Sequence, residues 1–144
     1  MFKKDLYITN AKDETIFLGE KYSSQVKLGE VIFLYGNLGS GKTTFIQGLA
    51  KGLGVERRII SPSFIIVRNY NLKKGNFYHI DLYRIQNNLD ILGLGIDQIL
   101  KDKNNIVALE WAEKITNNLP TKRTEIHFKY LDENKREIEI VKYE

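Results

Sequence analysis

The stretch VIFLYGNLGSGKTTF, Val31 to Phe45, decides the fold of this 144-residue chain. Its glycine-rich part fits the pattern G-x-x-x-x-G-K-[ST], in which glycines let backbone N–H groups approach phosphate oxygens without obstruction by side chains. Lys42 would place a positive charge near the β- and γ-phosphates, and the Thr43 hydroxyl would reach a bound Mg²⁺. A helix that begins near Thr43 would direct its positive end at the same anion. The stretch therefore predicts a phosphate-binding loop.

The residues on either side of the loop support this interpretation. Val31 to Tyr35 is a continuous apolar run typical of a buried strand. Thr43 to Leu53 predicts a helix, because Phe45 and Leu49 recur on one face, and Gly54 supplies a stop signal. We expect the nucleotide to contact the whole loop: Gly36, Asn37, Leu38, Gly39, Ser40, Gly41, Lys42, Thr43 and Thr44.

Length and composition narrow the class of protein. A chain of 144 residues predicts one domain, residues 1–144, with a single hydrophobic core. The absence of cysteine excludes disulfides and thiolate chemistry. The first ten residues lack the apolar core of a signal peptide, and no apolar run is long enough to span a bilayer, so we expect a cytoplasmic protein without membrane contact.

The net charge of +4 comes mostly from scattered lysines with asparagine between them. Such a composition is typical of a solvated surface and permits contact with RNA without arguing for it.

Strands alternate with helices along the chain. Strands are expected at 3–9, 31–35, 63–72, 77–85 and 104–111, helices at 11–26 (capped near Asn10), 43–53, within 89–101 and at 112–117, and a closing hairpin at 124–131 and 136–144. This order predicts an α/β fold of the P-loop NTPase type. It should be a three-layer sandwich with a mixed, partly parallel central sheet and a C-terminal β-hairpin.

Two acidic residues are candidates to complete the chemistry. Glu110 ends the apolar strand IVALE, and ligands of open α/β sheets gather at the carboxyl ends of strands, so Glu110 is expected to bind Mg²⁺ together with Thr43. Asp81 shares one strand face with His79, and we expect Asp81 to position water or the outer hydration shell of Mg²⁺. Two other interpretations remain open, a salt bridge from Asp81 to Arg84 and a metal site formed by His79 with Asp81. The candidate catalytic residues are therefore Lys42, Asp81 and Glu110.

Alternative functions have weaker support. Asp90 to Gly93 matches the D-x-x-G pattern of GTPases, but it follows no apolar strand, and the guanine-reading pattern is absent. A small-molecule P-loop kinase usually carries an arginine-bearing lid, and the pair Arg57-Arg58 lies too close to the loop's helix to serve as one. An RNA-binding protein with an incidental nucleotide site would need an RNP-like aromatic and basic motif, which the sequence lacks.

Four motifs in one order resemble a known family. GNLGSGKTTF, SPSF at 61–64, HIDLYR at 79–84 and LEW at 109–111 are similar to those of the bacterial TsaE (YjeE) ATPases, and the resemblance covers nearly the whole chain. It implies an ATPase, weak alone and stimulated by partners, of the machinery that installs threonylcarbamoyl on adenosine 37 of tRNAs reading ANN codons. The partners implied are TsaB and TsaD, and TsaD carries out the transfer.

The resemblance also implies roles for individual residues. ATP and Mg²⁺ are the implied cofactors, with Lys42 and the loop on the triphosphate and with Thr43 and Glu110 on the metal. Asp81 and the SPSF segment match a nucleotide-sensitive switch region, and Thr15 and Arg136 match positions beside the nucleotide. Trp111 is either a core residue or an aromatic that faces the nucleotide or a partner. Contact with tRNA is expected through the partners, and the sequence leaves a direct contact open.

Overall fold

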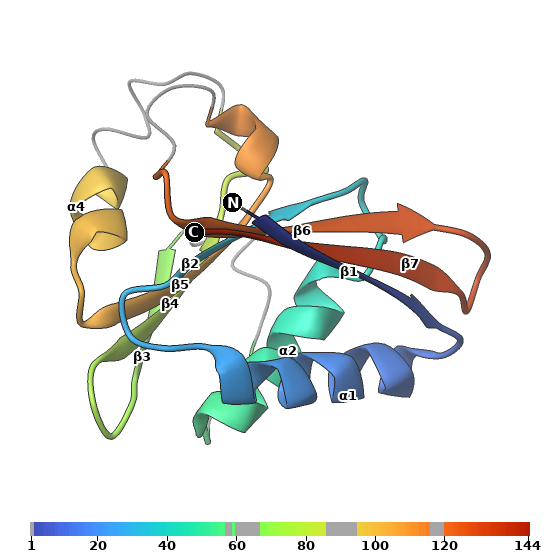
Figure 1. Ribbon diagram of the computed structural model, residues 1–144, viewed down its shortest axis with the longest axis horizontal. Helices are drawn as coiled ribbons and strands as arrows, with labels where there is room; N and C mark the ends of the chain where they lie inside the picture. The colour runs from blue at the N-terminus through green and yellow to red at the C-terminus, as the bar shows by residue number, and fades with distance from the viewer. Residues whose placement is uncertain (1, 57–58, 60–66, 86–94, 116–119) are drawn as a thin grey trace.

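A seven-stranded mixed sheet forms the centre of the molecule (Figure 1). The computed structural model describes residues 2–56, 59, 67–85, 95–115 and 120–144. The strands are β1 (Phe2–Thr9), β2 (Val31–Tyr35), β3 (Val67–Asn71), β4 (Asn76–Asp81), β5 (Asn105–Glu110), β6 (Arg123–Tyr130) and β7 (Arg136–Tyr143). Their order across the sheet is β1-β7-β6-β2-β5-β4-β3. β2 is parallel to both β5 and β6, and β4 is parallel to β5, whereas the outer pairs are antiparallel. The predicted mixed sheet and C-terminal hairpin are confirmed.

Helices cover the sheet on both faces, which gives the three predicted layers. Helices α1 (Lys12–Tyr22) and α2 (Lys42–Leu53) lie together on one face, and α4 (Ile96–Lys101) lies on the other (Figure 1). The strand β2 shows why two cores form, because its side chains alternate between the faces. Ile32 and Leu34 join the core under α1 and α2, while Phe33 joins the core under α4, and all three are fully buried.

Two glycines let α1 and α2 pack closely. A Cβ atom on Gly48 of α2 would lie 1.8 Å from the Ile16 carbonyl oxygen of α1. A Cβ atom on Gly19 of α1 would lie 2.2 Å from the Phe45 carbonyl oxygen. The backbones therefore touch directly, and this contact fixes α1 beside the helix that follows the phosphate loop.

Several expected element ends are corrected by local hydrogen bonds. The first helix ends at Tyr22 rather than at Val26, because the Ser23 and Ser24 hydroxyls donate to the carbonyls of Glu20 and Lys21 and a short 3₁₀ turn, η1 (Ser23–Gln25), follows. Its N-cap is Ala11 rather than Asn10, and the Asn10 backbone N–H donates to the Glu14 carboxylate at 3.0 Å.

The later elements are shorter than expected. β4 ends at Asp81 instead of continuing to Ile85, because the Asp81 carboxylate accepts the Tyr83 backbone N–H at 2.9 Å and forms a turn. The expected helix at 112–117 is a 3₁₀ turn, η2 (Ala112–Lys114), within the described residues. The structure describes the second half of the helix expected within 89–101, which is α4. Residues 63–66 of the expected third strand, the SPSF segment, Arg57-Arg58 and the Asp90 to Gly93 stretch lie outside the described residues.

No helix in the described ranges is long and apolar enough to cross a membrane.

Candidate functional site

The glycine loop leaves β2 and enters α2 in a compact turn. Gly36 has a φ of 149°, and a Cβ atom there would lie 2.6 Å from the Ser40 Oγ and 2.8 Å from the Phe128 carbonyl oxygen. Gly41 has a φ of 106° and stands directly before the first helical residue, Lys42. Only glycine meets both demands without strain. In the described part of the chain, the amides of Lys42, Thr43 and Thr44 have no backbone acceptor, as expected for the first turn of a helix.

Lys42 lies inside this loop rather than in solvent. Its side chain is buried, its Nζ donates to the Gly36 carbonyl at 2.5 Å, and Nζ lies 3.6 Å from the centre of the Trp111 ring. Burial lowers the pKa of Lys42, although the nearby carboxylates of Glu110, Glu113 and Asp81 oppose that shift. An ammonium group held at low dielectric beside the glycine loop is well placed to bind phosphate.

Trp111 reaches Lys42 through an unusual backbone conformation. Its φ is 60°, and it is the one residue other than glycine with positive φ within the described ranges. Strain of this kind is concentrated at functional sites. The ring packs 5.1 Å from that of Tyr83 and also borders the core under α4. Trp111 is thus partly a core residue and partly a wall of the site.

Glu110 is a buried carboxylate at the end of β5, and two neighbours hold it. The Thr43 Oγ1 donates to this carboxylate and lies 3.0 and 3.1 Å from its two oxygens. The His79 Nε2 lies 2.5 Å from Oε2 of Glu110. Both side chains are nearly inaccessible, with His79 0% and Glu110 3% exposed. Because a carboxylate accepts hydrogen bonds, the His79 Nε2–H is the donor to Glu110. The Nδ1 of His79 has no hydrogen-bond partner among the described residues.

The parallel pairing of β4 with β5 creates this arrangement. Asp81 is opposite Glu110 and His79 is opposite Ala108, so the two acids end neighbouring strands on the same side of the sheet. Burial raises the pKa of Asp81, and the Glu110 carboxylate adds to that shift, while the Tyr83 N–H opposes it. The structure does not favour the alternative metal site formed by His79 with Asp81, because His79 is fully buried and its Nε2 is already paired with the Glu110 carboxylate.

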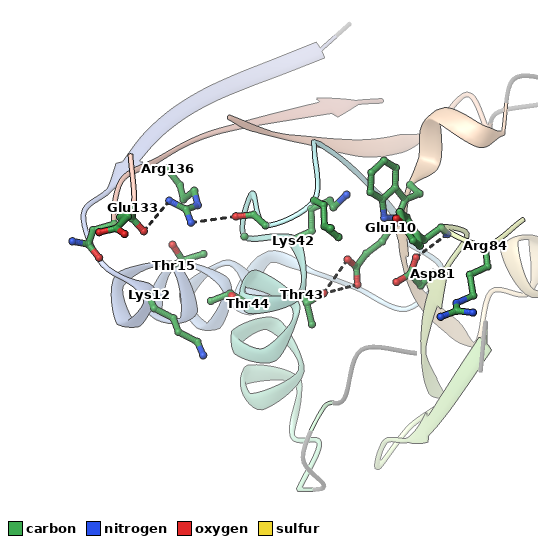
Figure 2. A pocket seen from close by; sticks show the side chains of 16 residues that line it. Lys12, Thr15, Lys42, Thr43, Thr44, Asp81, Arg84, Glu110, Glu133 and Arg136 are labelled. Atoms are coloured by element: carbon green, nitrogen blue, oxygen red, sulfur yellow. Dashed lines mark hydrogen bonds between the residues drawn. The ribbon is translucent and has the colours of Figure 1, made fainter. Parts of the chain in front are cut away.

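These groups line one cleft with a volume of about 490 Å³ (Figure 2). Its lining residues are Lys12, Thr15, Leu38, Gly39, Gly41, Lys42, Thr43, Thr44, Asp81, Tyr83, Arg84, Glu110, Trp111, Glu133, Asn134 and Arg136. The cleft brings together segments that are far apart in the sequence, because α1 and the turn between β6 and β7 form one wall, and the loop and strand ends form the rest (Figure 2).

Thr15 and Arg136 lie at the end of the cleft away from Glu110 (Figure 2). The guanidinium of Arg136 donates to the Gly39 carbonyl at 3.2 Å and to the Asp132 carbonyl at 2.6 Å, so it links the hairpin turn to the glycine loop. Thr15 is buried, and its hydroxyl is 2.7 Å from that of Thr9. Both side chains therefore border the space beside the loop.

Most of the expected site residues meet at this cleft, and three of the loop residues lie outside its lining. Gly36 and the buried Ser40 form the underside of the loop, and the Asn37 carbonyl accepts the Ser40 N–H. Sequence reasoning missed Lys12, Glu133 and Asn134. They reach the cleft from a helix start and a hairpin turn, and no local pattern distinguishes them from surface residues.

The donor set suits a magnesium ion bound with phosphate. Mg²⁺ prefers oxygen ligands and is usually held by one or two protein groups together with phosphate oxygens and water. Thr43 and Glu110 supply a hydroxyl and a buried carboxylate within hydrogen-bond distance of each other. The residues present therefore fit the metal.

Known proteins resemble this chain in sequence and in fold. A family model described as "Threonylcarbamoyl adenosine biosynthesis protein TsaE" matches residues 9–138, which is most of the chain. The chain belongs to the TsaE family. That span contains the glycine loop, Asp81, Glu110 and Arg136. All the residues that line the cleft lie within the family match.

Individual TsaE relatives agree with the family model. The protein named tRNA threonylcarbamoyladenosine biosynthesis protein TsaE from Bacillus subtilis (strain 168) is 37% identical over 126 residues, which cover 88% of this chain and 78% of the relative. The protein of the same name from Rickettsia prowazekii (strain Madrid E) is 35% identical over 132 residues, which cover 91% and 90%. A crystal structure of Bacillus subtilis YdiB superposes with a TM-score of 0.83 at 31% identity, covering all of this chain and 88% of the other.

Proposed function

We propose that this protein is a Mg²⁺-dependent ATPase that acts in the cytoplasm, together with TsaB and TsaD, in the biosynthesis of threonylcarbamoyladenosine in tRNA. The observation that carries the proposal is the meeting of Lys42, Thr43 and Glu110 in one cleft of a TsaE-family chain. The names of the relatives supply the pathway.

The glycine loop and the start of α2 would hold the triphosphate. The amides of Lys42, Thr43 and Thr44 point out of the first helical turn and are available to phosphate oxygens. Lys42 would exchange the Gly36 carbonyl for the β- and γ-phosphates, which are stronger acceptors for an ammonium group. Thr43 and Glu110 would hold Mg²⁺. The bound ion would neutralise part of the negative charge of the phosphates.

Asp81 would orient the water that attacks the γ-phosphorus. Its carboxylate lines the cleft next to Glu110, and the Tyr83 N–H fixes one of its oxygens. Its raised pKa makes it a stronger proton acceptor than an ordinary aspartate. His79 is placed to act through Glu110 as a positioning residue rather than as a catalytic residue, because it is fully buried.

The site favours hydrolysis that drives a partner over transfer to a small molecule. Lys42, Thr43, Asp81 and Glu110 line the part of the cleft beside the start of α2, and they are side chains of the kinds that bind and hydrolyse a nucleoside triphosphate. Nothing among them suits activation of threonine or of a carbamoyl donor. We therefore assign the transfer itself to the partners.

The experiment that tests the proposal is ATP hydrolysis by the purified protein, alone and with TsaB and TsaD. We expect the partners to stimulate hydrolysis, and Lys42→Ala to abolish nucleotide binding and with it the stimulation. Glu110→Ala should retain much of the binding and lose Mg²⁺-dependent turnover. Equal rates with and without the partners would contradict the proposed role, and wild-type hydrolysis by Glu110→Ala would remove that residue from the site.

A further inference from the structure

A second cleft lies at the opposite end of the parallel strands. It has a volume of about 560 Å³, similar to that of the nucleotide cleft. Val31, the first residue of β2, lines it, whereas the glycine loop follows Tyr35 at the other end of the same strand. A five-residue strand is about 15 Å long, so the two clefts are separate and a ligand in one leaves the other accessible.

Four segments distant in the sequence converge on this second cleft. The Glu30 N–H donates to the Lys27 carbonyl and closes a turn between these two residues. The Gly29 N–H donates to the Asn105 carbonyl at 2.8 Å, which joins this turn to the start of β5. The start of β6 and the end of β7 complete the cleft, because Arg123 is paired with Tyr143. The order of the strands in the sheet thus brings together four segments that show no common pattern in the sequence.

Positive charge is concentrated in this cleft. Five of its lining residues are basic, Lys27, Lys103, Lys122, Arg123 and Lys142, and two are acidic, Glu30 and Glu144. The lining of this cleft therefore has a net charge of +3, whereas the net charge of the whole chain is +4. Four lysines and one arginine that are far apart in the sequence therefore lie together at this cleft.

Three of the lysines are available to a ligand. Arg123 is engaged by the Glu125 carboxylate at 2.7 Å, and Lys142 is 3.5 Å from that of Glu30. Lys27, Lys103 and Lys122 are exposed and have no ion pair among the described residues. Exposed lysines on separate loops act as mobile point charges, which suit a row of phosphates better than one small planar anion.

We propose that this basic cleft binds the phosphodiester backbone of RNA, and that in the cell the RNA is tRNA. The choice of tRNA rests on the proposed function, whereas the phosphate chemistry rests on the cleft itself. Binding through Lys27, Lys103 and Lys122 is independent of base sequence, because all three contact the backbone only. Since the cleft is remote from the glycine loop, the chain holds RNA and nucleotide at the same time.

The test is tRNA binding by the purified chain, measured by fluorescence anisotropy with an unmodified labelled transcript at several salt concentrations. The cleft variant carries Lys27→Gln, Lys103→Gln and Lys122→Gln. The matched control carries Lys21→Gln, Lys51→Gln and Lys129→Gln, three exposed lysines that do not line the cleft. Each set removes three positive charges and lowers the net charge from +4 to +1.

We expect the cleft variant to bind tRNA at least tenfold more weakly than the control. Its log-log salt slope should be smaller by about 2, because each lost phosphate contact removes 0.7–0.9 of a released counterion. Equal losses in both variants, or no tRNA binding by the wild type at low salt, would overturn the proposal. ATP hydrolysis measured on the same preparations keeps this result separate from the proposed function, since all three proteins retain the nucleotide cleft.

Discussion

At the scale of single residues, the Glu110 carboxylate depends on two hydrogen-bond donors. Thr43 belongs to the proposed metal site, whereas His79 lies behind it, fully buried, with its Nε2 2.5 Å from the carboxylate. A partner in this position fixes which oxygen faces the metal, and loss of such a partner typically weakens metal affinity or activity by about 10–100-fold.

Substitution of His79 separates this role from simple packing. His79→Gln places an amide donor close to the Nε2 position and should keep Mg²⁺ dependence near that of the wild type. His79→Asn places its amide near Nδ1, and about tenfold more Mg²⁺ should then be needed for half-maximal hydrolysis. Titration of hydrolysis with Mg²⁺, alongside nucleotide binding measured without Mg²⁺, checks both variants. An unchanged Mg²⁺ requirement in His79→Asn would contradict the positioning role.

The buried Asp81 carboxylate is expected to lower the free energy of unfolding, although it is proposed to take part in hydrolysis. Its pKa is raised in the folded state, so between the unfolded and folded pKa values the folded protein binds more protons, and stability falls as the pH rises through that window. Asp81→Asn keeps an acceptor for the Tyr83 N–H and removes the buried charge. It should therefore raise the free energy of unfolding at pH 7 and lower hydrolysis by about 100-fold.

Urea unfolding at pH 7 and near pH 3.5, together with hydrolysis assays, measures both effects. The stability difference between Asp81→Asn and the wild type should shrink at the lower pH, where the aspartate is mostly protonated in both states. A variant that is less stable than the wild type at pH 7 would contradict the argument.

At the scale of elements, the contact between α1 and α2 sets one wall of the nucleotide cleft. α1 carries Lys12 and Thr15, and α2 begins at Lys42, so their spacing determines the width of the cleft. That spacing depends on glycines whose hydrogens face a backbone carbonyl across the interface.

Gly48→Ala should separate the two helices. The added methyl group would meet the Ile16 carbonyl at 1.8 Å, which only a backbone shift can relieve, so we expect a loss of about 2 kcal/mol or more in the free energy of unfolding. Nucleotide affinity should fall as well, because the wall moves. Lys51→Ala, on the exposed side of α2, is the control and should change stability by about 0.5 kcal/mol at most. Chemical denaturation with a parallel binding assay measures both, and unchanged stability of Gly48→Ala would contradict the close packing.

At the scale of the whole molecule, the proposed nucleotide site draws on segments far apart in the sequence, from Lys12 of α1 to Arg136 of β7. Binding should therefore stabilise the entire fold. At 100 times its dissociation constant, Mg²⁺·ATP should add about 2.7 kcal/mol, seen as a rise of several degrees in the melting temperature. Lys42→Ala should show no rise, and differential scanning fluorimetry with a non-hydrolysable analogue tests this. A rise that persists in Lys42→Ala would locate binding elsewhere.

The local features of the site follow from the sequence, as does the meeting of Glu110 with Thr43, whereas the other long-range contacts do not. The loop, its helix and the alternation of His79 with Asp81 depend on residues close together, so their patterns are readable. The contact between His79 and Glu110 depends on β4 lying beside β5, which strand order alone decides. The same limit applies to Arg136 on Gly39 and to the basic cleft, whose lysines come from four segments.

The pairing of β1 with β7 brings the two ends of the described chain together. Phe2 is opposite Tyr143 in antiparallel register, and the ends lie close to each other in Figure 1. A turn of a few residues would span that gap. The chain can thus be circularly permuted to begin at α1 and end with β1, so that the three strands β6, β7 and β1 form a continuous meander. In the permuted chain, β1 would pair with β7, the strand that directly precedes it in sequence. This edge of the sheet would then form through contacts between neighbouring segments alone.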